Sequence, residues 1–237
     1  MDVRLADLYT ILSVIEHDLD THCYRPGPWA QFVRLVQQRP QAERMILAAD
    51  ISRVSEKLHR RHGRRTLSIP LGVGLELLAT ALGAGLLVVG LRTASTVAVL
   101  AAAVIWITTS EPLVKITVGS LLGIQYDYVY LYGIEPRFKM RYGAYLAASR
   151  AARVVLHLSG TIGSPLAAWF VSYLAHPMLP FAALVCNVVF WVLGGVNATL
   201  FITALIGLRH LGPLRLDASS GGVAGSELHA ALVAGRV

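Results

Sequence analysis

The chain has little charge for its size. Asp, Glu, Lys and Arg make up only 15% of its 237 residues, whereas soluble proteins average about 25%. So few charged side chains cannot cover the water-facing surface of a globule of this length. This excludes a soluble domain, a disordered chain and a soluble nucleic-acid-binding protein, although the net charge is +7. The 55% of hydrophobic residues indicates instead a protein that spans a membrane several times.

Cysteine is scarce too, and a phosphate-binding loop is lacking. Cys23 lies in a polar region and Cys186 in an apolar run, so the sequence predicts neither a disulfide framework nor a cysteine-based metal site. The glycine-rich stretch at 218–225 has no following Lys-Ser or Lys-Thr, as a phosphate loop requires. Its composition is typical of a flexible tail, which we expect over residues 209–237.

Four apolar runs are long enough to cross a hydrocarbon core, which needs about 20 residues of helix. The second run continues past Pro112 to about residue 124. We therefore expect an all-α integral membrane protein with about four transmembrane helices and a membrane domain over residues 67–208. The runs cover residues 67–91, 94–110, 154–175 and 181–208.

The positive charges indicate an orientation. Of the 21 Lys and Arg residues, eleven precede the first run, five separate the second from the third, and three follow the fourth. The other two connections carry Arg92 alone and no cation, respectively. Because cytoplasmic loops are enriched in Lys and Arg, this distribution predicts a multi-pass protein of the cell membrane with both termini in the cytoplasm.

Residues 1–66 are predicted to form a cytosolic module of three helical stretches. The first has leucine and isoleucine at three- and four-residue spacing from Leu5 to Leu19, and Pro28 is placed to begin the second. The third opens after Pro40, and its expected apolar stripe is Met45, Ala49, Ile51, Val54 and Leu58. The basic run at 57–65 is expected to orient the chain and to lie against anionic lipid.

Ionisable residues at membrane depth need a reason, because each costs about 2.5–3.5 kcal/mol on insertion scales. Glu76, Glu111 and Lys115 are such residues. In one interpretation, Lys115 reaches toward the headgroups and Glu111, four residues earlier, neutralises it. In the other, all three line a cavity or join the first two spans. His157 opens the third run among small and hydroxyl residues, which helix packing explains.

Tyrosines alternate at positions 126, 128, 130 and 132 within residues 124–133. A period of two predicts a short membrane-associated strand with one aromatic face. This face could form an interfacial aromatic belt, or the strand could be the edge of a small sheet that offers its backbone to a peptide. Tyr126, Tyr128, Tyr130 and Tyr132, together with Lys115, are our candidate partner-binding residues.

Residues 16–23, Glu-His-Asp-Leu-Asp-Thr-His-Cys, gather side chains of the types that bind metals. Metal sites require three or four converging ligands, and a solvated helix end explains this composition equally well. We therefore predict no metal at this segment.

Residues 94–217 resemble the core of site-2-type intramembrane metalloproteases. That family has a span with His-Glu-x-x-His followed by Gly-Ile or Gly-Val, then a short sheet, a span that opens near Ala-Gly-Pro-Leu, and a last span with Leu-Asp-Gly. Here the second run reads Ser110-Glu-Pro-Leu-Val-Lys, and Gly123-Ile124 follows it. The tyrosine-rich segment takes the place of the sheet, Gly163-Ser-Pro-Leu166 opens the third span, and Leu216-Asp217 echoes the last motif.

The chemistry of the family is not retained. Glu111 stands where the resemblance places the first zinc-binding histidine, Pro112 where it places the catalytic glutamate, and Lys115 where it places the second histidine. An ammonium group repels a metal ion, and proline cannot act as a general base. The resemblance therefore implies a member that has lost its protease centre, with zinc disfavoured.

Three functions follow from these observations. The first is a non-catalytic protease-like core that binds a membrane partner, namely a helix, a peptide or a lipid. The second is a membrane-embedded hydrolase or metalloprotease-type enzyme with Glu76, Glu111 and His157 as candidate catalytic residues and Asp217 as a further one. The third is a small transporter subunit, because carboxylates within spans mark ion pathways. Nucleic-acid binding is not expected.

Overall fold

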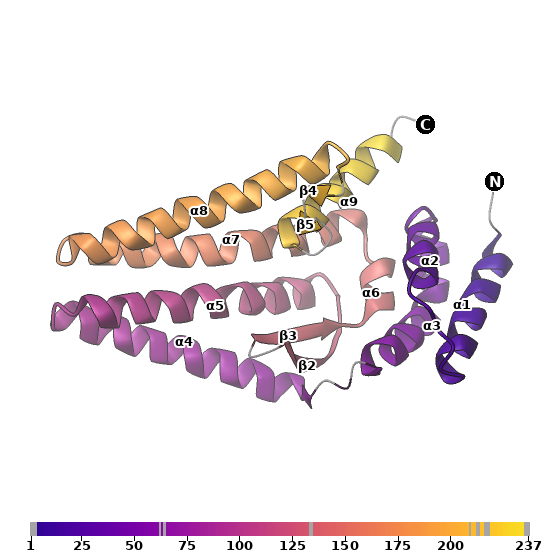
Figure 1. Ribbon diagram of the computed structural model, residues 1–237, viewed down its shortest axis with the longest axis horizontal. Helices are drawn as coiled ribbons and strands as arrows, with labels where there is room; N and C mark the ends of the chain where they lie inside the picture. The colour runs from indigo at the N-terminus through magenta and orange to yellow at the C-terminus, as the bar shows by residue number, and fades with distance from the viewer. Residues whose placement is uncertain are drawn as a thin grey trace. The chain divides into compact units, whose positions relative to one another are not determined.

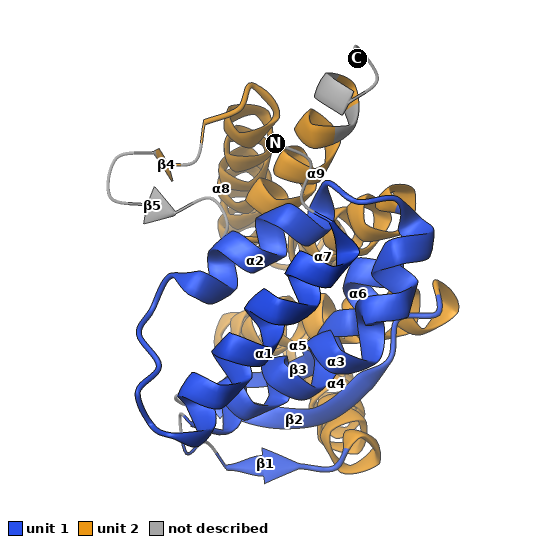
Figure 2. Cartoon of the chain, turned by 90° about the vertical axis from the view of Figure 1, so that its right-hand side faces the viewer, with its two compact units in different colours: residues 1–68, 123–149 blue, residues 69–122, 150–237 orange. Residues whose placement is uncertain are grey.

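The computed structural model describes residues 4–61, 63, 65–132, 135–208, 210–211, 214–215 and 219–234 (Figure 1). The chain forms two compact units (Figure 2). Unit 1 comprises residues 1–68 and 123–149, and unit 2 comprises residues 69–122 and 150–237. Unit 1 thus combines the predicted N-terminal module with the connection between the second and third apolar runs.

Three helices form the N-terminal part of unit 1, as the sequence predicts. The apolar residues spaced by three and four along the first helix are buried, and they face the apolar stripe of the third. That stripe includes Leu47, Ile51 and Val54. Met45, which is 61% exposed, and Ala49, which is also exposed, do not belong to it, so the predicted stripe is wrong at these two residues. The helices are α1 (Leu5–Asp20), α2 (Pro28–Gln37) and α3 (Gln41–Arg60).

An antiparallel sheet with the order β1-β2-β3 completes unit 1, and its middle strand is the tyrosine-rich segment. The predicted strand is therefore confirmed. Val129 and Tyr130 pair with β3 on one side and with β1 on the other, so this part of β2 is not a free edge. A short helix, α6, packs on α3. The bounds are β1 (Thr66–Leu67), β2 (Tyr126–Tyr132), β3 (Glu135–Met140) and α6 (Tyr142–Ala147).

Unit 2 contains four helices that are long and apolar enough to cross a membrane. They match the four apolar runs of the sequence. Each packs on the next along the chain, and all four contribute to a core of mainly small side chains, including Ala102, Ala182 and Cys186. The helices are α4 (Ile69–Arg92), α5 (Thr96–Leu121), α7 (Arg150–Ala175) and α8 (Pro180–Leu205).

Small residues set the close approach of these helices. A Cβ atom on Gly83 of α4 would lie 2.6 Å from the Trp106 ring of α5, so no larger residue fits there without a shift. The Trp106 indole donates a hydrogen bond to the carbonyl of Thr80 at 2.9 Å. On α7, Ser164 donates to the carbonyl of Ile107 at 2.7 Å. Small and hydroxyl residues thus pack and join these apolar helices, the kind of contact that membrane helices also use.

The C-terminal part of unit 2 differs from the flexible tail that its glycine content suggested. Residues 220–234 form a helix, α9 (Ser220–Ala234), which packs against α7 and α8. Glycines allow this helix to approach α8 closely, so here they serve packing instead of flexibility. Before it come two short paired strands, β4 (His210–Leu211) and β5 (Leu214–Arg215).

Candidate functional site

An ion pair on α5 forms the centre of the candidate site. Lys115 Nζ lies 2.5 Å from Glu111 Oε1, as their four-residue spacing predicts. Ser220, at the start of α9, donates a hydrogen bond to the same carboxylate oxygen at 2.9 Å. The aliphatic stem of Lys115 crosses Gly160 of α7 so closely that a Cβ atom at this glycine would collide with it. Both ends of the ion pair are therefore held by neighbouring helices.

His157 lies on the same helix as Gly160, three residues before it, and is 8% exposed. Three residues make about one helical turn, so His157 lies on the face of α7 that the Lys115 stem crosses. The structure thus brings His157 next to the Glu111–Lys115 pair, which the sequence did not predict. We call Glu111, Lys115, His157 and Ser220 the polar cluster.

The fourth span also reaches this region. The Asn197 amide of α8 donates to the carbonyl of Thr161 at 3.4 Å. Glu111 is ten residues from the end of α5, and Asn197 is eight from the end of α8. At 1.5 Å per residue, these positions are about 12–15 Å from the helix ends. The polar groups therefore lie well inside the two apolar helices.

Glu76 does not belong to the polar cluster. It is 4% exposed, on the face of α4 that packs against α5. One turn later, Thr80 donates to the Thr109 hydroxyl at 3.1 Å and thereby joins the two helices. Within the described residues, no hydrogen bond or ion pair engages the Glu76 carboxyl group. The interpretation in which Glu76, Glu111 and Lys115 line a cavity or join the first two apolar helices therefore gains no support from a direct contact of Glu76.

The side chains of the polar cluster do not suit a zinc ion. The Glu111 carboxylate is already bound to an ammonium group, which repels a metal ion. In the part of the chain that the structure describes, no group of three or more His, Cys, Asp or Glu side chains could hold a metal ion. Asp217, the remaining residue suggested by the resemblance, lies outside the described residues.

Sequence reasoning missed a second polar contact, between α7 and α9. Arg153 donates through Nε and Nη2 to the two carboxylate oxygens of Glu227, at 2.9 and 2.8 Å. The side chains are only 1% and 7% exposed. Glu227 was overlooked because its surroundings resemble a flexible tail. A signal was present nonetheless, since Gly221 and Gly225 have the four-residue spacing of helix-packing motifs.

The tyrosines of β2 do not form one aromatic face. A β-bulge shifts the register between Tyr126 and Tyr128, and the inserted residue turns the strand. Tyr126 packs on Phe138 at a ring distance of 6.3 Å. Tyr128 and Tyr130 instead contact His59 of α3, with ring distances of 5.6 and 4.4 Å. The side chain of Tyr132 lies outside the described residues.

Tyr128 and Tyr130 therefore serve the packing of unit 1. The Tyr128 hydroxyl donates to Glu56 at 2.9 Å and lies 2.7 Å from Nδ1 of His59. Burial and the Glu56 carboxylate raise the pKa of Tyr128, and burial alone raises the pKa of Tyr126 to about 12. The contacts of Tyr128 and Tyr130 with α3 explain these two side chains without a binding partner.

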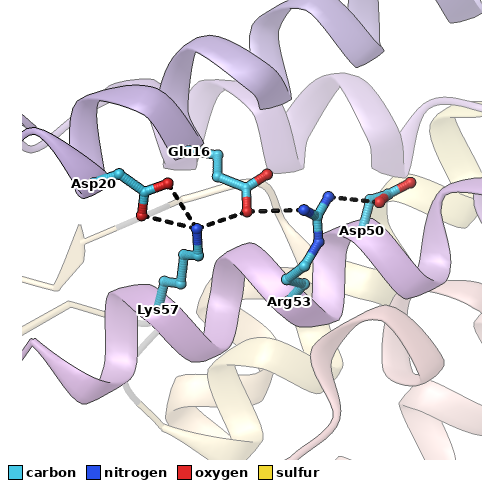
Figure 3. Close-up of polar contacts among 5 residues, drawn as sticks. All are labelled: Glu16, Asp20, Asp50, Arg53 and Lys57. Carbon is cyan, nitrogen blue, oxygen red and sulfur yellow. Dashed lines mark hydrogen bonds and ion pairs between the residues drawn. The ribbon is translucent and has the colours of Figure 1, made fainter.

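Within residues 16–23, which gather side chains of the types that bind metals, Glu16 and Asp20 form ion pairs with cations of α3 (Figure 3). Glu16 accepts from Lys57 and Arg53, both at 2.9 Å, and Asp20 lies 2.8 Å from Lys57. Arg53 also pairs with Asp50 at 2.7 Å. The hydrogen bonds that Lys57 donates to the carboxylates of Asp20 and Glu16 raise the pKa of its ammonium group. This network joins α1 to α3 across the surface of unit 1.

The basic run at 57–65 is partly neutralised within unit 1. Besides Lys57, Arg60 pairs with Glu56 at 2.6 Å and Arg61 donates to the carbonyl of Tyr24 at 3.2 Å. These contacts leave less charge for anionic lipid than the sequence suggested. His62 and Arg64 lie outside the described residues.

Comparison with known proteins does not place the chain in a family. No protein-family model, curated protein or solved structure matches the chain. The resemblance to site-2-type metalloproteases therefore stays a hypothesis, and function has to be argued from the geometry above.

Proposed function

We propose that this protein is a non-catalytic integral membrane protein whose unit 2 binds a membrane partner. The observation that supports this most is the state of Glu111 and Lys115. In the protease-like arrangement these positions would hold the metal, but here they neutralise each other. Ser220 and Gly160 fix the pair from two neighbouring helices, so its geometry suits a structural contact between helices.

A catalytic alternative finds less support. General acid–base chemistry requires two groups within hydrogen-bond reach of the same substrate. Glu76 lies on α4 against α5, while His157 lies on α7, and no hydrogen bond or ion pair joins the Glu76 carboxyl group to another described residue. The transporter alternative depends on Glu76 as a lone carboxylate, and the described residues offer it no ion-binding partner.

We further propose that the four apolar helices span the cell membrane with both termini in the cytoplasm. Their length and apolar composition support the insertion. The distribution of Lys and Arg supports the orientation, because nearly all of the cations lie in the two segments of unit 1 or after α8.

The proposal is tested on the full chain, purified in detergent and reconstituted into lipid nanodiscs. We expect metal analysis to find zinc well below one ion per chain, and a panel of transmembrane-helix peptides to remain uncleaved. Glu111→Gln and Lys115→Gln should lower the unfolding temperature, because each leaves a charged partner uncompensated among packed helices.

Thr117→Val serves as the matched control, since Thr117 is an exposed residue of the same helix. It should leave the unfolding temperature close to that of the wild type. Stoichiometric zinc, together with peptide cleavage that Glu111→Gln abolishes, would contradict the proposal and establish a protease.

A further inference from the structure

Helix α9 lies against the last turns of α8, and its glycines lie where the backbone of α8 comes closest. A Cβ atom on Gly221 would lie 2.8 Å from the carbonyl oxygen of Asn197, and one on Gly225 would collide with that of Phe201. Further along, the His229 ring lies 2.9 Å from the carbonyl oxygen of Leu205. Because 221, 225 and 229 are four residues apart, a single face of α9 makes all these contacts.

The other neighbour of α9 is α7, and here the contact is ionic. Glu227 receives both hydrogen bonds from Arg153, which is 1% exposed. We call the space between α7 and α8 that α9 fills the groove. Any helix that fills it must bring a carboxylate to Arg153, since removal of one partner of a buried ion pair is strongly destabilising. It must also bring glycine to the two positions that meet α8. The groove thus specifies the pattern Gly-x-x-x-Gly-x-Glu.

The helix that fills the groove is weak by itself. Among its 15 residues are Gly221, Gly222 and Gly225, and each glycine costs about 1 kcal/mol of helix stability relative to alanine. Isolated helices shorter than about 12–15 residues are marginal in water even when they are rich in alanine. The helical state of α9 therefore depends on its contacts with α7 and α8, and a better helix with the same pattern would compete with it.

We propose that the groove between α7 and α8 is the partner-binding site of unit 2, and that α9 occupies it as an intramolecular ligand. The partner that fits is a helix of another membrane protein with the pattern Gly-x-x-x-Gly-x-Glu, whose glycines meet α8 and whose glutamate, on another side of the helix, meets Arg153 of α7. This inference rests on the proposed function and names the chemistry of its partner. Binding of the partner displaces α9 and releases the hydrogen bond from Ser220 to Glu111.

The test uses the full chain in nanodiscs and a fluorescent peptide with the sequence of residues 219–234. The chain is prepared as wild type, Glu227→Ala and Gly225→Leu. The first variant removes the carboxylate of α9 and the second makes α9 collide with α8, so the two weaken docking in different ways. Ser226→Ala is the control, because Ser226 is exposed on the same helix.

We expect the peptide to bind both α9 variants at least about tenfold more tightly than the wild type or the control, which corresponds to 1.4 kcal/mol. A peptide with glutamine in place of its glutamate, or with leucine at the position of Gly225, should lose this binding. Circular dichroism and size-exclusion chromatography verify that each variant remains folded. If one of the two variants does not fold, the other still tests the inference.

Equal binding to wild type and variants, or no binding to either folded variant, would overturn the inference. A chain that is dimeric before the peptide is added, and that the peptide converts to monomers, would assign the groove to α9 of a second copy and overturn the choice of partner. Cleavage of the bound peptide would contradict the proposed non-catalytic function while leaving the groove as the binding site.

Discussion

Arg153 and Glu227 form a buried, bidentate ion pair although 74 residues separate them in the chain. The contact joins the first turn of α7 to the middle of α9. Such a pair costs desolvation for both charges, and its value lies in the geometry it imposes. In this protein, it places the glycine face of α9 against α8 and the start of α9 against Glu111.

Replacement of either partner should destabilise unit 2. Arg153→Met and Glu227→Leu are each expected to lower the free energy of unfolding by about 3–5 kcal/mol, because each breaks the buried ion pair from one side. The double substitution Arg153→Met with Glu227→Leu should recover most of this loss. Unfolding in detergent measures the effect, with Ser226→Ala as control. Additive losses in the double variant would show that the two side chains are not coupled.

Gly143→Ala should destabilise unit 1. A Cβ atom at this position would collide with the backbone carbonyl of Ala48, so α6 has to move away from α3. We expect a loss of about 1–3 kcal/mol, the usual range for overpacking, in thermal unfolding followed by circular dichroism. Gly194→Ala on α8, where a Cβ atom meets open space, is the control. Equal stability of wild type and Gly143→Ala would show that α6 does not pack as described.

Tyr126→Phe should reduce the sensitivity of unit 1 to alkali. Burial raises the pKa of Tyr126 to about 12, whereas an unfolded tyrosine titrates near 10. Between these values the unfolded chain loses a proton that the folded chain keeps, so the stability is present below pH 10 and declines toward pH 12. In denaturant titrations, the free energy of unfolding of Tyr126→Phe should fall less over this pH range than that of the wild type. Tyr9→Phe changes an exposed residue, and its free energy of unfolding should fall as much as that of the wild type.

Lys139→Met should change the pH dependence in the opposite sense. Burial lowers the pKa of Lys139 below 10.5, and its ammonium group donates to Ser55 at 2.9 Å. Between the lowered value and 10.5 the unfolded chain holds more protons, so this residue makes stability rise with pH. Relative to the variant, the wild type should become more stable as pH rises toward 10.5. A constant difference between the two would contradict a buried ammonium group.

Much of the fold could be predicted, because long apolar helices are recognised by the length of their apolar runs and amphipathic helices by the spacing of their apolar residues. The four apolar helices and the pairing of Glu111 with Lys115 followed from run length and four-residue spacing. The strand of β2 followed from its period of two. The bulge after Tyr126 could not be foreseen, since it depends on pairing with β3 and not on the local pattern.

The candidate site was predictable only in part. The pairing of Glu111 with Lys115 followed from their four-residue spacing, but the place of His157 beside them did not, because it depends on how α7 packs on α5. Ser220 and Glu227 were hidden, because glycine promotes both flexibility and close helix packing, and composition alone does not separate the two. Only the contacts with α7 and α8 show that packing applies here.

The central claim is that lipid surrounds α4, α5, α7 and α8 and that the cation-rich segments all lie on one side. The most direct measurement is labelling of single cysteines with a membrane-impermeant maleimide in sealed vesicles. Met140→Cys and Met178→Cys are introduced separately into a chain with Cys23→Ser and Cys186→Ala. The account predicts that these two cysteines react from opposite faces of the membrane. Reaction of both from the same face would contradict it.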